Sequence, residues 1–162
     1  MDLSKRPLIG VMGPSRCTSE AWELARAVGR LIGTGGGILV CGGGRGVMEA
    51  AACGAKESGG ITVGILPGSS ASEANHYIDI PVVTGLGNAR NAINVLTSQA
   101  IIAILGGYGT LSEIALALKC GKPVIALKTW TLIQPQGEPE PGVIVAATPE
   151  EAVSAAFAAA QH

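Results

Sequence analysis

Short continuous apolar runs recur along this chain, and each is followed by glycines or polar residues. Runs of this length without alternation are typical of strands that are buried on both faces of a sheet. A weaker run from Tyr77 to Thr84 contains Pro81 and is expected near a sheet edge, because proline cannot donate to the ladder. Val143–Val145 is a candidate for a last short strand. The stronger runs are Leu8–Met12, Ile38–Cys41, Ile61–Leu66, Ile101–Leu105 and Pro123–Leu127.

Between these runs, apolar residues repeat at helical spacing and predict helices. The last helix has the clearest start, because Thr148 as the cap, Pro149 at the first position and Glu151 at the third form a capping-box arrangement. The stretches Pro67–Asn75 and Thr129–Gly142 are expected to be loops. The helices are expected from Ser19 to about Ile32, over Val47–Ser58, from Asn88 or Ala89 to about Ser98, from Thr110 to Gly121 and from Thr148 to Gln161.

Strands and helices therefore alternate from one end of the chain to the other, with connections too long for hairpins. This alternation predicts an α/β fold, a Rossmann-like three-layer sandwich whose mostly parallel sheet has about six to seven strands. The sequence contains no internal repeat and no linker, and its 162 residues suit one domain spanning 1–162.

The composition adds an expectation about partners. Hydrophobic residues make up 48% of the chain, charged residues 14% and aromatic residues 3%, so the core must be aliphatic. Low charge over a large apolar fraction suggests that part of the surface is covered by a second subunit, and a homo-oligomer (a dimer or tetramer) is expected. The net charge of −1 provides no electrostatic footprint for nucleic acid or for an anionic membrane.

The sequence also bears on location and metals. No apolar run approaches the roughly 20 residues that span a bilayer, and Met1–Pro7 has no apolar segment of a signal peptide behind it, so a cytoplasmic protein is expected. The cysteines are scattered without a C-x-x-C pair and both histidines lie far from them, so neither disulfides nor a metal site are expected.

Three glycine-rich turns follow predicted strands and carry the strongest functional signal. They contain Gly13 with Ser15, Gly42–Gly46 and Gly106–Gly109. In an open parallel sheet, ligands bind outside the carboxyl ends of the strands, so these turns are expected to converge on one site. A strand, a glycine turn and a helix together present free backbone N–H groups and a helix N-terminus to an anion, most often a phosphate. Thr110 adds a hydroxyl, and Tyr108 would either stack on a flat ligand or cover the turn.

Charged residues beside these turns are the further candidates. Arg45 places a guanidinium beside bare backbone amides, which suits a phosphate or a carboxylate. Arg90 lies in the first turn of its helix, where a cation opposes the helix dipole, so it is either solvated or faces a ligand or an acidic neighbour. Glu113 also lies in a first turn, where a carboxylate is stabilising in any protein, and its role is left open.

Several common site types are excluded. The Gly42–Gly46 run is not the dinucleotide fingerprint, which needs G-x-G-x-x-G after the first strand, and no G-x-x-x-x-G-K-[ST] P-loop is present. Ser15 and Ser112 have no triad context.

With Val40–Gly44, Ala89–Asn91 and Gly106–Glu113 in view, the chain resembles the Rossmann-like superfamily once labelled lysine decarboxylases. That superfamily includes the Lonely Guy phosphoribohydrolases and the molybdenum cofactor carrier proteins. The resemblance covers about Pro7 to Leu127, and its Gly-Gly-x-Gly-Thr-x-x-Glu element is specific. No lysine lies in a pyridoxal-phosphate setting, so a lysine decarboxylase is not expected.

The resemblance implies two alternatives, and a nucleotide-sensing module is a third. Lonely Guy enzymes cleave the N-glycosidic bond of nucleoside 5′-monophosphates. In such an enzyme Glu113 would stabilise the oxocarbenium-like state or activate water. Arg90 would stabilise charge at the phosphate or at the leaving group. A carrier would instead bind and protect a phosphate-bearing pterin, the molybdenum cofactor, without turnover. The enzymes usually have Pro-Gly-Gly and Arg-Lys, whereas this chain has Leu105-Gly106-Gly107 and Arg90-Asn91, which counts against a direct transfer of the enzyme activity. The run Thr84–Asn91 and the motif Cys41–Gly44 look closer to the carrier branch.

The expected ligand is therefore a small phosphate-bearing molecule, either the molybdenum cofactor or a nucleoside monophosphate. The residues predicted to bind it are Gly13, Ser15, Gly42, Gly43, Gly44, Arg45, Arg90, Asn91, Gly106, Gly107, Tyr108, Gly109, Thr110 and Glu113.

Overall fold

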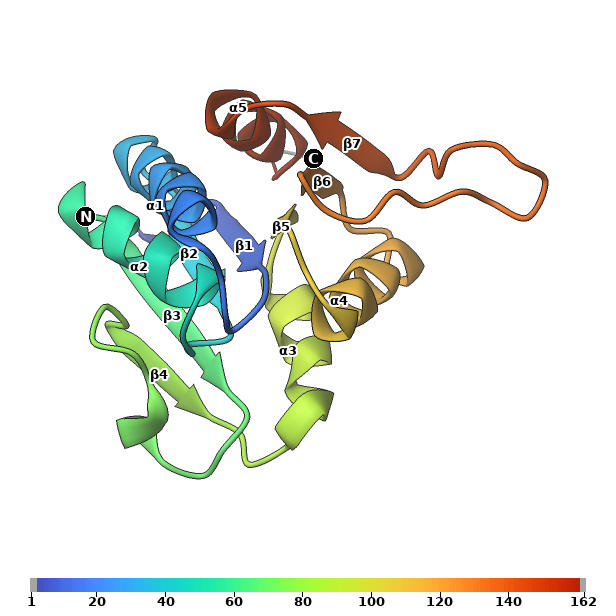
Figure 1. Cartoon of the computed structure of the whole chain (residues 1–162). Coiled ribbons are helices and arrows are strands. Elements are labelled where there is room, and N and C mark those ends of the chain that lie inside the picture. Colours follow the sequence, from blue (N-terminus) through green and yellow to red (C-terminus); the bar gives the residue numbers. More distant parts are fainter. Residues whose placement is uncertain (1–2, 161–162) are drawn as a thin grey trace.

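The strands form one parallel sheet in the order β4-β3-β2-β1-β5-β6-β7, as the computed structural model of residues 3–160 shows (Figure 1). Every pairing between neighbouring strands is parallel. The predicted Rossmann-like α/β fold is thereby confirmed. The strands are β1 (Leu8–Met12), β2 (Ile38–Cys41), β3 (Ile61–Leu66), β4 (Ile80–Val83), β5 (Ala100–Ile104), β6 (Val124–Leu127) and β7 (Val143–Ala146).

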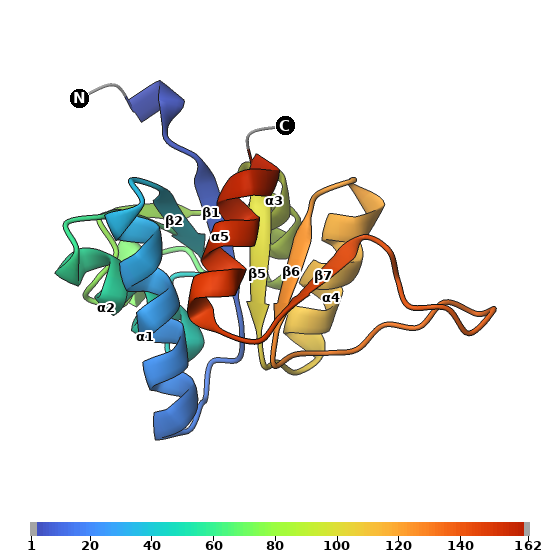
Figure 2. The ribbon, with the colours of Figure 1, turned by 90° about the horizontal axis from the view of Figure 1, so that it is seen from above.

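Helices cover both faces of the sheet (Figures 1 and 2). Side chains of α1, α2 and α5 pack with one face of the strands into the larger aliphatic core, and those of α3 and α4 pack with the other face into a smaller one. The helices are α1 (Ser19–Thr34), α2 (Val47–Glu57), α3 (Arg90–Thr97), α4 (Tyr108–Lys119) and α5 (Pro149–Ala160).

Several element boundaries differ from the predictions by one to three residues, and three of the differences have clear local reasons. β4 lies at the edge, as expected, but starts at Ile80. The residue before it, Asp79, uses its side chain to bind β3, because Oδ2 of Asp79 accepts a hydrogen bond from the Thr62 N–H at 3.0 Å. β5 ends at Ile104, because Leu105 has a φ of +53° and leaves the strand conformation. α4 begins at Tyr108, two residues before the expected start, because Gly107 already serves as its N-cap.

The start of α5 is capped by Thr148, whose Oγ1 accepts a hydrogen bond from the Glu151 N–H at 3.2 Å. The Glu151 carboxylate accepts in return from the Ala147 N–H, one residue before the position of a regular capping box. Gln161, the predicted end of this helix, lies outside the described residues.

The predicted loop between β6 and β7 forms an arm that extends away from the sheet (Figure 2). An antiparallel bridge joins Ile133 to Pro139, and the Gln134 N–H donates to the Glu138 carbonyl at 2.7 Å. The arm is therefore held by its own backbone hydrogen bonds, and Ile133 at its bridge is exposed.

Two helix glycines bring α1 and α2 into close contact. A Cβ at Gly29 would lie 1.8 Å from the carbonyl oxygen of Ala51, and one at Gly54 would lie 1.9 Å from that of Arg26. Real Cβ atoms cannot approach backbone oxygens this closely, so only glycine allows the two helices to pack at this separation.

Some large apolar side chains remain at the surface, among them Leu86, Leu96 and Val145. Such positions are compatible with a surface covered by a second copy, and self-association stays a prediction. Within the described part of the chain, no helix is both long and apolar enough to cross a bilayer.

Candidate functional site

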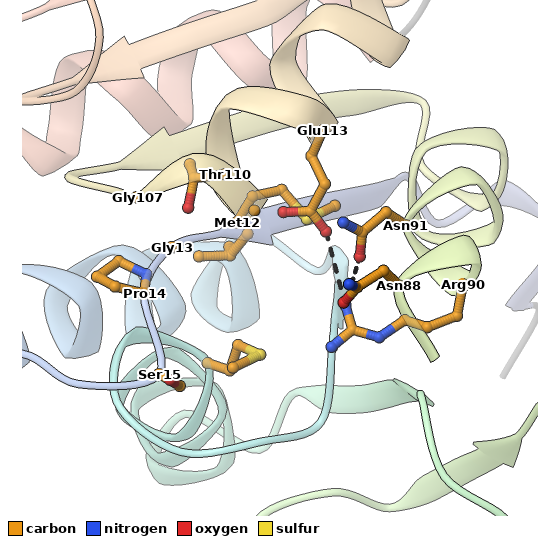
Figure 3. A pocket seen from close by; sticks show the side chains of 14 residues that line it. Met12, Gly13, Pro14, Ser15, Asn88, Arg90, Asn91, Gly107, Thr110 and Glu113 are labelled. Atoms are coloured by element: carbon orange, nitrogen blue, oxygen red, sulfur yellow. Dashed lines mark hydrogen bonds and ion pairs between the residues drawn. The ribbon is translucent and has the colours of Figure 1, made fainter. Parts of the chain in front are cut away.

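A cavity of about 350 Å³ opens at the carboxyl ends of β1 and β5 (Figure 3). From β1 the chain continues through β2 and β3 to one side of the sheet, and from β5 it continues through β6 to the other. The cavity therefore lies at the topological switch point of the sheet, where the loops that follow β1 and β5 run in opposite directions and leave a crevice between them. It is lined by Val11, Met12, Gly13, Pro14, Ser15, Gly42, Met48, Asn88, Arg90, Asn91, Gly107, Gly109, Thr110 and Glu113.

The structure brings most of the predicted site residues together. Among the predicted residues, Gly44 and Arg45 instead line a second, adjacent cavity of about 460 Å³. Gly43, Gly106 and Tyr108 line neither of these two cavities. The predicted residues on the walls of the first cavity are Gly13, Ser15, Gly42, Arg90, Asn91, Gly107, Gly109, Thr110 and Glu113.

The three predicted residues outside both cavities have other positions in the turns. Gly43 has a φ of +72°, and a Cβ there would lie 2.6 Å from the Leu66 side chain. Gly106 has a φ of +126°, and its Cβ would lie 2.5 Å from that of Thr110. Tyr108 is 84% exposed and its ring lies beside that of Trp130, with the centroids 6.2 Å apart. Both glycines thus shape the turns, and Tyr108 lies on their outer side.

The N-terminus of α4 forms one wall of the cavity. Its N-cap, Gly107, provides no side chain to accept a hydrogen bond from the first turn. The backbone N–H groups of the first turn of any helix have no partner within the helix, and the helix dipole makes this end positive. Thr110 lies in this turn and is 3% exposed. An anionic group in the cavity would meet these donors.

Glu113 lies one turn further along α4 and is buried. Its Oε1 accepts a hydrogen bond from Nδ2 of Asn94 at 3.1 Å. The same oxygen lies 3.7 Å from Nη1 of Arg90, as Figure 3 shows. Burial raises the pKa of the Glu113 carboxyl to about 7, although the Asn94 hydrogen bond and the Arg90 charge oppose the increase. This carboxyl can therefore exchange a proton near neutral pH.

Arg90 and Asn91 connect the start of α3 to the glycine turn. Nη1 of Arg90 donates to Oδ1 of Asn91 at 2.9 Å, and Nδ2 of Asn91 donates to the Ser112 hydroxyl at 3.1 Å. That hydroxyl donates to the Gly109 carbonyl at 2.7 Å. The unfavourable position of Arg90 in its helix is thus explained by an acidic neighbour, Glu113, since the side chain turns toward it.

The glycine at position 42 makes room for the Arg90 guanidinium. A Cβ there would lie 2.7 Å from Nη2 of Arg90, 2.8 Å from Nη1 and 2.7 Å from Sδ of Met48. Both side chains therefore occupy space at the wall of the cavity that a side chain at residue 42 would need.

Sequence reasoning missed several residues of this region. Asn94 is fully buried, and its polar side chain on the inner face of α3, four residues after Arg90, was a usable signal. Met48 lies within the predicted helix Val47–Ser58 and Asn88 at the predicted start of the next helix, and no motif marks either of them as a site residue. Trp130 donates from Nε1 to the Gly107 carbonyl at 3.2 Å, and the Thr129 hydroxyl donates to the Leu105 carbonyl. No local pattern indicates these last two contacts.

Substituting Trp130 with phenylalanine is expected to weaken ligand binding about fivefold, the value of one neutral hydrogen bond. The indole donor to Gly107 would be lost while the ring contact with Tyr108 is largely kept. Calorimetric titration with AMP measures the affinity. Tyr108→Phe is the matched control, because it keeps a ring and removes no hydrogen bond to the turn; an equal effect of both variants would contradict the prediction.

The parallel sheet and the cavity at its switch point define a Rossmann-like protein with room for a small ligand. Residues 6–153 match the SLOG cluster4 family, and the chain belongs to that family.

Solved structures and a sequence relative resemble the chain over most of its length. The molybdenum cofactor binding protein of the phototrophic bacterium Rippkaea orientalis has a TM-score of 0.85 at 40% identity, over 95% of this chain and 97% of that one. The molybdenum cofactor carrier protein of Chlamydomonas reinhardtii has a TM-score of 0.85 at 41% identity, over 98% and 100%. A cytokinin riboside 5′-monophosphate phosphoribohydrolase of Mycobacterium tuberculosis is 36% identical over 121 residues, which are 69% of this chain and 65% of that protein. The predicted resemblance to carriers and Lonely Guy enzymes is confirmed.

Proposed function

We propose that this chain binds a phosphate-bearing, nucleotide-like small molecule in the switch-point cavity, and that it does so as a carrier of the molybdenum cofactor. The observation that carries the proposal is the composition of the cavity wall, in which the N-terminus of α4 lies opposite the Gly13 turn and beside Arg90. The phosphate would lie against the backbone N–H groups of Gly109 and Thr110. Cavities of about 300 Å³ or more accept drug-sized ligands.

The apolar part of the wall suits the pterin ring of such a cofactor. Met12 and Met48 provide polarisable thioethers, and Val11 and Pro14 complete this side. Asn88 and Asn91 add donors and acceptors that can fix a ring edge. The donor set of the cavity therefore fits a phosphorylated heterocycle.

Two features support a carrier over an enzyme. Asn91 stands where the resemblance leads us to expect a lysine, and its Oδ1 accepts from Arg90; an ammonium group has no acceptor and could not make this contact. Without that lysine, the site has one cation fewer than is usual in the enzymes that the chain resembles. In addition, the relatives with the higher structural coverage are molybdenum cofactor proteins, whereas the alignment with the phosphoribohydrolase spans 65% of that protein.

One observation favours the second candidate, a nucleoside monophosphate phosphoribohydrolase. The pKa of Glu113 lies at about 7, near the value at which a general acid or base works best at neutral pH, and Arg90 lies beside it. In this alternative Glu113 would protonate the leaving base or activate water.

Incubation with AMP, followed by an assay of free adenine, separates the two functions. The carrier proposal predicts no adenine release by the native chain and saturable binding of the molybdenum cofactor. Release of adenine that disappears in Glu113→Gln would overturn the carrier proposal and establish the enzyme. The Glu113→Gln variant keeps the size of the side chain, so the comparison isolates its charge and its proton.

The raised pKa of Glu113 also predicts a pH dependence of stability. A carboxyl whose pKa is higher in the folded state binds more protons there than in the unfolded state, so the free energy of unfolding decreases as pH rises from about 4.5 to about 7. Glu113→Gln removes this contribution. Urea unfolding at about pH 5 and about pH 8 should show the variant gaining stability relative to the native chain at the higher pH. A difference independent of pH would show that Glu113 titrates normally.

A further inference from the structure

The second cavity, of about 460 Å³, adjoins the proposed ligand site. Ser15, Gly42, Met48 and Arg90 line both cavities, so these four residues form the boundary between them. Beyond this boundary the walls come from the loops after β1, β2 and β3, which contribute Arg16, Gly44, Arg45, Leu66, Pro67 and Glu73.

The charged groups of this second cavity are predominantly cationic. Arg16 follows the Gly13 turn and Arg45 lies within the Gly42–Gly46 run, so two separate loops bring guanidinium groups to one hollow. Among the ion pairs found between described residues, none involves either arginine. Both are therefore available to an anion from solution, and paired guanidinium groups suit phosphate oxygens well.

The one carboxylate on this wall is already engaged. Oε1 of Glu73 accepts a hydrogen bond from the Ser70 N–H at 3.2 Å, within the capping box of a short turn. The carboxylate lies over Gly68, where a Cβ would be only 1.8 Å from Oε2. Glu73 thus lies against its own loop, and the positive charge of Arg16 and Arg45 is only partly balanced.

Arg90 lies on the boundary and lines both cavities. Nη1 faces Glu113 and Asn91 in the first cavity, and Nη2 lies 2.7 Å from the position that a Cβ at Gly42 would take, on the boundary. The positive end of the α2 dipole lies here too, because this helix begins at Val47, directly after Arg45 and Gly46, with no side-chain cap; its first turn also contains the acidic residue Glu49.

We propose that Arg16 and Arg45 form a second anion subsite, and that the ligand of this chain carries two anionic groups, one on each side of Arg90 and Met48. The proposal rests on the proposed function for the first group, which lies at the N-terminus of α4. The second group lies between the two arginines, and a nucleoside monophosphate fills only the first half of the cleft.

Tungstate, an oxyanion of phosphate type, tests the subsite without knowledge of the ligand. Calorimetric titration and crystals soaked in tungstate should both show two ions per chain, one at α4 and one at Arg16 and Arg45. The double variant Arg16→Ala, Arg45→Ala should keep only the ion at α4, while Arg30→Ala, which removes an exposed arginine of α1 outside both cavities, should keep both.

Each other result has a definite meaning. A single ion at α4 in the native chain would overturn the second subsite and leave the proposed function standing. An ion at the arginines but none at α4 would support the second subsite and overturn the proposed function. Loss of both ions in a folded double variant would overturn the inference, because the ion at α4 would then also depend on Arg16 and Arg45 and the two subsites would not be separate.

A comparison of nucleotides then shows whether one molecule carries both anionic groups. Adenosine 3′,5′-bisphosphate should bind the native chain about tenfold more tightly than AMP, the value of one charge-assisted contact. The double variant should lose this advantage while its affinity for AMP changes less than about twofold. Equal affinities of the native chain for the two nucleotides would overturn the two-anion ligand.

Discussion

Alanine at position 90 is expected to lower the affinity for AMP or for the molybdenum cofactor about a hundredfold while the fold survives. Arg90 places a cation at the proposed ligand site, and its side chain is 15% exposed, so its contacts are poorly screened by solvent. The guanidinium also connects α3 to the glycine turn through Asn91. The substitution therefore removes both a charge and the positioning of a loop.

Two further variants make the Arg90 prediction specific. Arg90→Lys should recover part of the affinity, because an ammonium restores the charge but not the planar guanidinium, whose Nη1 contacts both Asn91 and Glu113. Arg30→Ala should leave the affinity unchanged, since Arg30 lies on α1 away from the cavity. Calorimetric titration measures all three, and circular dichroism verifies the fold. Full affinity in Arg90→Ala would show that Arg90 serves only to balance Glu113.

The second large effect is expected from a substitution at Gly54, and it concerns the free energy of unfolding. Gly54→Ala should destabilise the chain by about 3 kcal/mol, the upper range for overpacking a tight contact. In an open helix interior the same change would stabilise by about 1 kcal/mol, because alanine has the higher helix propensity. Here the new Cβ would lie 1.9 Å from the Arg26 carbonyl oxygen, so α1 and α2 must move apart.

Urea unfolding measures the Gly54 effect, and Gly109→Ala is the matched control. A Cβ at Gly109 would meet nothing within 4 Å, so this helical glycine should tolerate alanine without loss of stability. Gly54→Ala at native stability would indicate that the contact between α1 and α2 relaxes freely.

The strands and the fold class could be predicted from the sequence because the relevant signal is local. A run such as Ile101–Ile104 is apolar at every position, which only a strand covered on both faces requires. The convergence of the Gly13, Gly42 and Gly107 turns followed from topology, because the carboxyl ends of parallel strands lie at one edge of a sheet. The binding roles of these residues stay predictions.

The remaining contacts join residues that are distant in sequence, and no local pattern encodes them. Asn94 reaches Glu113 only because α3 and α4 pack together on one face of the sheet. Trp130 supports Gly107 from the start of the arm. The boundary between the two cavities at Met48 and Arg90 depends on how the loops after β1, β2 and β3 pack against one another. The pattern of residues along a single sequence does not show such pairings.

The backbone at Leu105 bears on how this chain is related to the enzymes it resembles. Its φ of +53° is accessible to leucine at some cost, but the ring of proline fixes φ near −65°. A mutation of Leu105 to the proline usual in those enzymes would therefore disrupt the turn rather than convert it. Proline at position 105 would therefore require a different backbone path between β5 and the glycine turn.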